Sequence, residues 1–194
     1  MSPAATLDDE AARGAVLDTA DSVFYARGVG GTGMAEIRDA SGVSLRRLYG
    51  LYPSKHDLVA AWLEARHTSW MRWFRDGVET RVGGGASPVD ALFDTLAEWA
   101  ATPGYRGCAF VNTAAEVAEI DDRHLHIIGA HKRGLVAYLT ELMRDAGAAE
   151  PKPLGVALGI LVDGAIVQSA VFHSLEPIHA ANAAATRLAL IRAK

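Results

Sequence analysis

The chain has 194 residues, of which 50% are hydrophobic and 22% are charged. This length can bury a sizeable core, and no stretch alternates strictly between apolar and polar residues, so an all-α protein is expected. The formal net charge of −4 excludes a polybasic protein that coats nucleic acid over its whole surface. The single cysteine, Cys108, excludes an intrachain disulfide and a thiolate zinc cluster.

The first 80 residues are divided into helices by glycine, proline and capping residues. Gly28 and Gly42 are expected to end the first two helices, because glycine tolerates the left-handed conformation of a helix C-cap. Ser44 is a suitable N-cap for the third, Pro53 stops it from continuing, and Ser54 begins the fourth. The expected helices cover about residues 8–27, 34–41, 45–51 and 54–80.

The remainder is expected to form five further helices after a glycine linker at 83–85. Pro88, Pro151 and Pro177 each mark a helix start, because proline fits the first helical turn. The expected helices cover about residues 88–101, 109–119, 121–147, 151–174 and 177–192. Three short N-terminal helices are thus followed by a longer helical body. The whole chain is expected to have about nine helices.

No membrane partner is expected, although residues 154–172 form an apolar stretch that could just span a bilayer. This stretch carries Asp163, Gln168 and Ser169 and lacks flanking basic anchors, which favours a helix buried between helices. Residues 1–10 are acidic and lack the apolar core of a secretory signal. A cytoplasmic protein is therefore expected.

The segment 34–52 has the pattern of a helix, a tight turn and a second helix. The outward face of the second helix carries Ser44, Arg46, Arg47 and Tyr49. Residues 41–56 contain three basic side chains, Arg46, Arg47 and Lys55, and no acidic one, which gives a local charge of +3. Guanidinium and hydroxyl groups suit guanine edges and phosphate oxygens. An ordinary helix pair with a solvated basic face is the alternative, and spacing alone does not decide between them.

An ordered set of residues runs through the first third of the chain. It comprises Ala20, Phe24, Arg27, Gly28, Thr32, Ile37, Ser41, Gly42, Val43, Ser44, Leu48, Tyr49, Tyr52, Pro53, Ser54, Lys55 and Leu58. With these residues, the stretch 16–63 resembles the N-terminal domain of TetR-family transcriptional regulators. The match covers about a quarter of the chain, and the order and spacing of its residues are together specific for the family.

The resemblance implies a TetR-type DNA-binding domain over 8–60, with its helix-turn-helix at about 33–52, and a helical ligand-binding and dimerisation domain over 61–194. It implies a dimeric regulator, a repressor that a small and largely apolar ligand releases from a palindromic operator. The implied partners are double-stranded operator DNA, a second copy bound through the last two helices, and an unidentified small-molecule inducer.

Residue roles in DNA binding also follow from the resemblance. Thr32 and Lys55 are implied to contact phosphates, and Tyr52 to pack under the recognition helix. The predicted DNA-binding residues are Thr32, Gly33, Ser44, Arg46, Arg47, Tyr49, Tyr52 and Lys55. The sequence departs from the family pattern: Gly33 replaces a hydroxyl residue, Arg46 and Arg47 replace small residues, and Gly50 and Leu51 replace an aromatic–histidine pair. The operator sequence therefore stays open.

The resemblance further implies a ligand pocket in the body. Its predicted residues are Trp70, Phe74, Phe93, Trp99, Phe110, Asn112, Glu116 and His131. The alternative is that the aromatic residues are core and the polar ones are exposed or capping. The apolar residues expected at a dimer surface are Leu154, Leu158, Leu161, Ala165, Phe172, Leu188 and Ile191, for which an intrachain core is the alternative.

Enzyme activity, a metal site and a bound cofactor are not expected. A di-metal bundle needs two Glu-x-x-His pairs on facing helices and two further glutamates, and the pair Glu176 and His179 contains a proline and lies at a helix start. His124 and His131 could share a helix face, but two ligands are too few for a metal site. Cys108 is expected to be a small buried thiol rather than a redox sensor. A helical small-molecule-binding or adaptor protein without DNA binding remains an alternative function.

Overall fold

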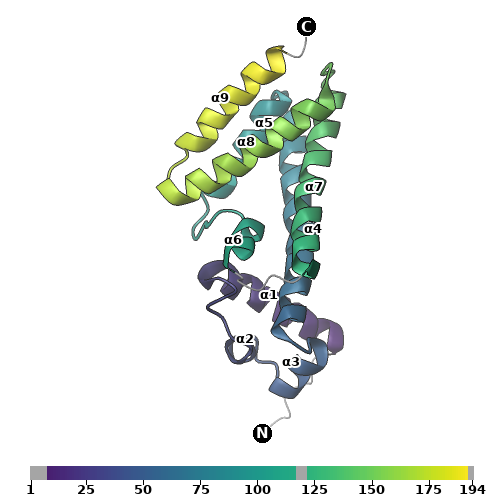
Figure 1. Ribbon diagram of the computed structural model, residues 1–194, viewed down its shortest axis with the longest axis vertical. Coiled ribbons are helices and arrows are strands. Elements are labelled where there is room, and N and C mark those ends of the chain that lie inside the picture. The colour runs from purple at the N-terminus through teal and green to yellow at the C-terminus, as the bar shows by residue number, and fades with distance from the viewer. Residues whose placement is uncertain (1–7, 117–121, 192–194) are drawn as a thin grey trace. The chain divides into compact units, whose positions relative to one another are not determined.

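The computed structural model describes residues 8–116 and 122–191, and within these ranges the chain forms nine α-helices and no strand. They are α1 (Asp9–Arg27), α2 (Met34–Ser41), α3 (Leu45–Leu51), α4 (Lys55–Gly83), α5 (Pro88–Ala100), α6 (Ala109–Glu116), α7 (Asp122–Asp145), α8 (Pro151–Phe172) and α9 (Glu176–Ile191) (Figure 1). The predicted fold class is confirmed. Positions 117–119 and 121 of the predicted sixth and seventh helices, and position 192 of the ninth, lie outside the described residues.

Local capping explains why the helices begin and end where the sequence predicted. The Asp8 carboxylate accepts a hydrogen bond from the Ala11 N–H at 2.8 Å and caps α1. Gly28, with φ +84°, ends α1, and Gly42, with φ +69°, ends α2. Both conformations are costly for residues with a Cβ atom. The chain therefore changes direction at these two glycines.

The helices form two compact units. The first contains the chain up to His67 together with the segment Phe110–Ile127, and the second contains Thr68–Ala109 and the chain from Ile128 onward. The long helix α4 contributes to both units, so the domain boundary predicted near residue 60 falls inside a continuous helix. The first unit also takes in α6 from Phe110 onward and the start of α7, which are distant from its other helices in the sequence.

In the first unit, α1 packs against α2 and α3, and its side chains also contact the start of α4. One face of α1 is buried through residues at four-residue spacing, namely Ala12, Val16, Ala20 and Phe24. The ring of Phe24 meets that of Trp62 edge to face, with centroids 5.2 Å apart. The Trp62 indole N–H donates to Asp21 at 2.7 Å, and Arg66 pairs with the same carboxylate. These contacts fix the beginning of α4 on α1.

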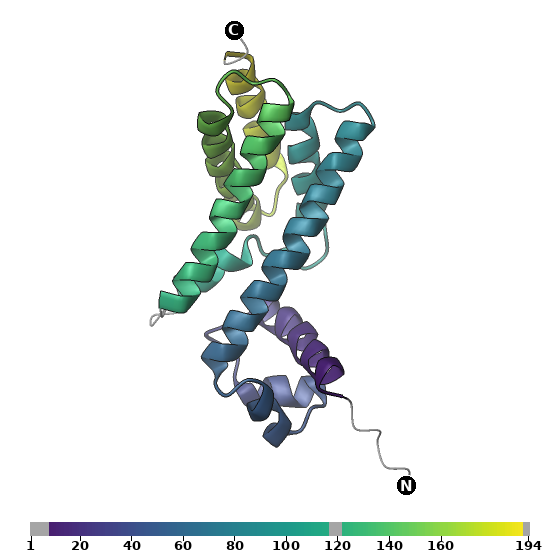
Figure 2. The same ribbon diagram turned by 90° about the vertical axis from the view of Figure 1, so that its right-hand side faces the viewer.

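The second unit is built around α8, which lies beside α9 in both views (Figures 1 and 2). Two glycines bring α8 close to α7. A Cβ atom on Gly155 would lie 2.3 Å from Thr140 Oγ1 and 2.8 Å from its backbone nitrogen, and one on Gly159 would lie 2.8 Å from Val136. The absence of these side chains therefore sets the distance between the two helices.

Helix α8 is long and apolar enough to cross a membrane, yet 44% of its most apolar window is buried within the protein. An apolar helix at the core of a soluble protein passes the same test of length and composition. Its packing against α5 and α9 supports that second description. One apolar helix of this kind is only weak evidence for a membrane partner.

One face of α8 remains exposed although it is apolar. The exposed residues on it are Val156, Ile160, Val167 and Val171, and Ile160 is 70% exposed. Among the residues predicted from sequence for a dimer surface, Leu154, Leu158 and Ala165 are instead buried in the chain's own core. Phe172 is exposed, Leu161 and Leu188 are half-buried, and the side chain of Ile191 lies outside the described residues.

We predict that Gly155→Ala lowers the free energy of unfolding by about 1–3 kcal/mol, because the added methyl group meets the α7 backbone. The matched control is Gly14→Ala in the exposed part of α1, where nothing lies within 4 Å of the added atom. There the same substitution should raise stability by about 0.5–1 kcal/mol through helix propensity. Chemical denaturation measures the free energy of unfolding of both variants. If Gly155→Ala and Gly14→Ala changed it by the same amount in the same direction, the close α7–α8 contact would be contradicted.

Candidate functional site

The orientation of α3 is fixed by side chains on its inner face. Leu48 is fully buried, and Val43 before α3 (5% exposed) and Tyr52 after it (4% exposed) are buried as well. On α2, Ile37 is also fully buried. Gly42 makes the left-handed turn between the two helices. These contacts produce the helix-turn-helix that the sequence predicted, with one face of α3 directed outward.

The outward face of α3 presents one arginine and several polar or aromatic groups. Arg46 and Ser44 are exposed, and Tyr49 has an exposed fraction of 45%. The Ser44 hydroxyl oxygen also caps the helix, because it accepts the Arg47 backbone N–H at 3.4 Å. This face can therefore offer guanidinium and phenol groups to a flat polar surface such as the edge of a base or a phosphate.

Arg47 differs from its neighbour. Its guanidinium donates to the carboxylate of Asp9 in the first turn of α1 at 2.9 Å, and its side chain is only 23% exposed. Asp9 lies outside the segment 41–56, so counting charges within that segment misses this pair. The cationic patch predicted from sequence is therefore partly neutralised at Arg47, and Arg46 is its most exposed arginine.

Three further residues from the DNA-binding prediction have roles inside the first unit. Thr32 is 2% exposed, and its hydroxyl donates to the Gly28 carbonyl at 2.9 Å, so this group is occupied within the fold. Gly33 is the N-cap of α2 and provides no side-chain cap. Tyr52 is buried with the Arg13 guanidinium over its ring, and burial raises the pKa of its phenol against the opposing effect of Arg13.

The start of α4 carries the last of the predicted contacts, Lys55, which is half-buried at the first helical position. Ser54 caps this helix. Its hydroxyl oxygen accepts the Asp57 backbone N–H at 3.1 Å and donates to the Asp57 carboxylate at 2.6 Å. Arg123 also donates to that carboxylate, at 3.1 Å. An anionic side chain thus already lies in the first turn of α4, beside the lysine.

Four of the predicted ligand-binding residues meet around Trp70 in the second unit. Trp70 stacks on Phe74 with centroids 4.8 Å apart, and it meets the rings of Trp99 and His131 edge to face, each at 5.5 Å. Phe74 and His131 are almost fully buried. The Trp70 indole nitrogen is buried without a hydrogen-bond partner among the described residues.

The other four predicted ligand-binding residues lie elsewhere. Phe93 is buried in α5, whereas Phe110, Asn112 and Glu116 belong to the first unit. Three aromatic residues that the sequence prediction did not include join the cluster: Trp73, Tyr105 and Tyr138. Tyr138 meets Phe74 from 64 residues away, which no local spacing reveals, whereas Tyr105 meets Trp99 from the loop that follows α5.

Burial raises the pKa of Tyr138 to about 12, with the negative charge of Glu79 adding to the effect. Its phenol is therefore neutral at physiological pH and can donate a hydrogen bond. Like the Trp70 indole nitrogen, the Tyr138 hydroxyl is buried without a hydrogen-bond partner among the described residues. Two buried donors of the aromatic cluster are thus unsatisfied.

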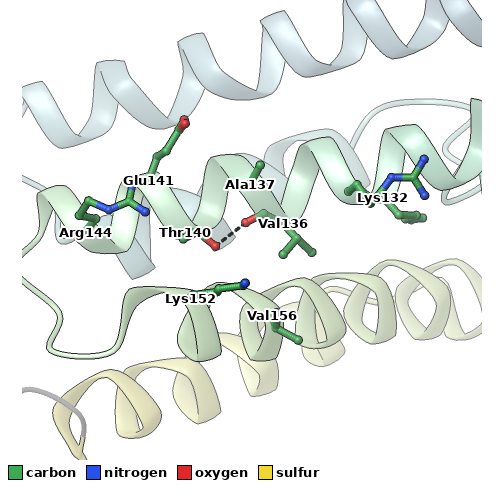
Figure 3. Close-up of a pocket in the computed structure, with 9 residues that line it drawn as sticks. Lys132, Val136, Ala137, Thr140, Glu141, Arg144, Lys152 and Val156 are labelled. Atoms are coloured by element: carbon green, nitrogen blue, oxygen red, sulfur yellow. Dashed lines mark hydrogen bonds between the residues drawn. The ribbon is translucent and has the colours of Figure 1, made fainter.

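A groove of about 510 Å³ lies between α7 and α8 (Figure 3). Its walls combine Val136 and Val156 with basic side chains such as Arg144 and Lys152, and Figure 3 shows residues from both helices facing it. No residue of the predicted ligand site lines this groove. Val156 also belongs to the exposed apolar face of α8, so the groove is continuous with that face.

Cys108 is 7% exposed, and a basic residue that is distant in sequence lies beside it. The Lys132 ammonium donates to its sulfur at 3.4 Å and to the Asp163 carboxylate at 2.6 Å. Burial alone would lower the pKa of Lys132, but its contacts with Cys108 and Asp163 outweigh burial and raise it. Arg106 is the basic residue nearest to Cys108 in the sequence, whereas Lys132 is on another helix and 24 residues away.

Comparison with known proteins gives a family match over the helix-turn-helix. The family described as bacterial regulatory proteins, tetR family, matches residues 16–62. Among solved structures, the TetR-family transcriptional regulator SCO4454 from Streptomyces coelicolor is 26% identical, with a TM-score of 0.80. The similarity covers 94% of this chain and 96% of that one. It therefore includes the helical body as well as the first helices.

Two further structures share the fold at lower identity. The reduced form of NemR from E. coli is 21% identical with a TM-score of 0.80, over 91% of this chain and 95% of that one. Regulatory protein TetR from Rhodobacter sphaeroides is 21% identical with a TM-score of 0.77, over 91% and 97%. No curated protein matches the chain at a significant level.

We predict that Ser54→Ala raises the pKa of Asp57 toward its ordinary value. The Ser54 hydroxyl is the main cause of the lowered pKa, and the Arg123 guanidinium adds to it. Because the folded-state pKa is depressed, this contribution to stability is present above the ordinary carboxyl pKa and is lost as the pH falls through the depressed value. NMR titration of the carboxyl group measures the shift.

The matched control is Ser87→Ala, because Ser87 caps α5 and lowers the pKa of Asp90 in the same way. That variant should shift the titration of Asp90 and leave Asp57 unchanged. A titration of Asp57 that is the same in the wild type and in Ser54→Ala would contradict the assigned cause.

Proposed function

We propose that this member of the TetR family of transcriptional regulators binds operator DNA as a homodimer and represses transcription until a small ligand releases it. The observation that carries the proposal is the exposed face of α3 on a helix that Leu48 holds in place. The protein acts by binding and not by catalysis, in the cytoplasm where its operator is accessible. A rigid helix with exposed polar groups fits the major groove.

The residues of α3 have separate roles in this proposal. Arg46 contacts a base edge or a phosphate directly, and Tyr49 and Ser44 contact the backbone. Arg47 joins the interface only when its pair with Asp9 opens or is shared with a phosphate. Lys55 contacts a phosphate at the start of α4. Thr32 supports the interface from within, since its hydroxyl is bound to Gly28.

The exposed apolar face of α8 is proposed as the dimer surface, together with the adjoining end of α9. Its members are Val156, Ile160, Val167, Val171 and Phe172 of α8 and Leu190 of α9. Exposed apolar side chains on one helix face are costly in water and favour association. A two-fold dimer places two copies of α3 on the two halves of a palindrome.

The aromatic cluster around Trp70 is proposed as the inducer site. The cluster supplies apolar surface, and the Trp70 indole and the Tyr138 phenol each supply a buried donor that has no hydrogen-bond partner among the described residues. Unsatisfied buried donors are costly, and an acceptor atom on a ligand would remove that cost. We infer a small, largely apolar or aromatic ligand with at least one hydrogen-bond acceptor.

Arg46→Ala is expected to weaken binding to a DNA fragment recovered from a random pool by about tenfold, the loss for one good base or phosphate contact. Arg47→Ala should have a smaller effect, because Asp9 already neutralises that side chain. Removing both arginines should also reduce the dependence of affinity on salt, since each lost phosphate contact releases about one counterion fewer. Gel-shift titrations at several salt concentrations measure both quantities.

Arg72→Ala is the matched control, since it removes the same charge from an exposed position in the second unit. It should leave the affinity nearly unchanged. If the Arg46/Arg47 double variant bound the fragment as tightly as the wild type, the proposed interface would be wrong. If the wild type bound no DNA, the chain would instead be a helical ligand-binding or adaptor protein.

Ile160→Glu is expected to convert a dimer into a monomer. The substitution replaces the most exposed apolar side chain of the α8 surface with a charged one, which would be buried in the dimer interface. Ala26→Glu, at an exposed position on α1, adds the same charge and should leave the dimer intact. Light scattering reports the molar mass. A wild-type protein with the mass of one chain would contradict the proposed homodimer.

A further inference from the structure

The last residue of α6, Glu116, binds the loop that leads into the helix-turn-helix. Its carboxylate accepts the Val29 backbone N–H at 2.7 Å and lies 3.5 Å from the Gly30 N–H, which donates to the same oxygen. The partners are 87 and 86 residues apart in sequence, and all belong to the first unit. A carboxylate bound to backbone N–H groups makes hydrogen bonds stronger than those between neutral groups.

Gly28 makes this close approach possible. Its φ of +84° is one that residues with a side chain rarely adopt, and a Cβ atom there would lie 2.4 Å from Glu116 Oε2. The C-terminal end of α1 is also the negative end of the helix dipole, where a carboxylate is disfavoured. The position of Glu116 therefore depends on the two loop N–H groups and cannot be attributed to a general attraction for the helix end.

A second set of contacts involves the part of the chain that follows the helix-turn-helix in the sequence. At the start of α7, Arg123 donates to Asp57 at 3.1 Å, and His124 Nε2 lies 3.0 Å from the backbone carbonyl of His56. Both partners are in the first turn of α4. The end of α6 and the start of α7 thus contact the chain just before α2 and just after α3.

We propose that Glu116 is a positioning residue that fixes the start of the helix-turn-helix to α6, so that the recognition helix keeps the orientation in which it meets DNA. The inference rests on the proposed DNA-binding function. It assigns Glu116 a positioning contact within the first unit, in place of the ligand contact predicted from sequence. Without this carboxylate, the Val29 and Gly30 N–H groups lose their acceptor, and the loop loses the contact that fixes it to α6.

The test compares Glu116→Ala with Glu141→Ala, which removes the same charge from an exposed position on α7 in the second unit. Two readouts are used: gel-shift affinity for the DNA fragment recovered from a random pool, and amide hydrogen exchange of Val29 and Gly30 by NMR. We expect Glu116→Ala to bind the fragment about tenfold more weakly than Glu141→Ala, as expected for loss of a charge-assisted hydrogen bond. Exchange at Val29 should be about tenfold faster.

Loss of a negative charge by itself favours binding to DNA, so weaker binding by Glu116→Ala cannot result from the change in charge alone. Glu116→Gln retains an acceptor oxygen without the charge and should fall between the wild type and Glu116→Ala in both readouts. It also keeps the test decisive if the alanine variant does not fold. Wild-type-like affinity in Glu116→Ala, with Val29 still protected, would overturn the proposal. If the wild type bound no DNA, the proposed function would fail, and the exchange rates would still report whether the contact exists.

Discussion

The proposed activity depends on the packing of Leu48 into the interior of the first unit. A helix of seven residues has too few hydrogen bonds to be stable by itself, so α3 takes its conformation and its orientation from tertiary packing. With Leu48 fully buried, Arg46 and Tyr49 must face outward. Gly42 sets the angle at which α3 leaves α2. The polar face of α3 is therefore held in one orientation before any partner binds, and binding does not have to order it.

This rigid helix is set in a protein whose net charge is negative, so electrostatic attraction to DNA must be local. The pair between Arg47 and Asp9 makes the attraction weaker than a count of basic residues suggests, and Asp57 lies beside Lys55. In the proposed interface, the pairing of Arg47 with Asp9 lowers the attraction of this side chain for phosphates of any DNA sequence. Selectivity then depends on the shape and direct contacts of α3, and on the spacing that a second copy would impose.

The helices were predictable because their ends are marked locally. Asp8, Gly28 and Gly42 act within a few residues of their own positions, and helix limits read from such signals agree with the structure to within a few residues. The contacts that decide function were not predictable in this way. Glu116 reaches a loop 87 residues away, and Arg47 meets a carboxylate 38 residues away. Helix α8 is apolar on most sides, so its periodicity does not distinguish the face that meets the core from the exposed one.

Selection of DNA fragments from a random pool by the wild-type protein tests the central claim most directly. A homodimer that places one α3 in each of two successive major grooves should enrich a palindrome whose half-sites are about one helical turn apart, or a multiple of it. Enrichment should fall as salt is raised, because phosphate contacts release counterions. Recovery of unenriched sequences, or of none, would contradict the claim that this helix-turn-helix recognises DNA.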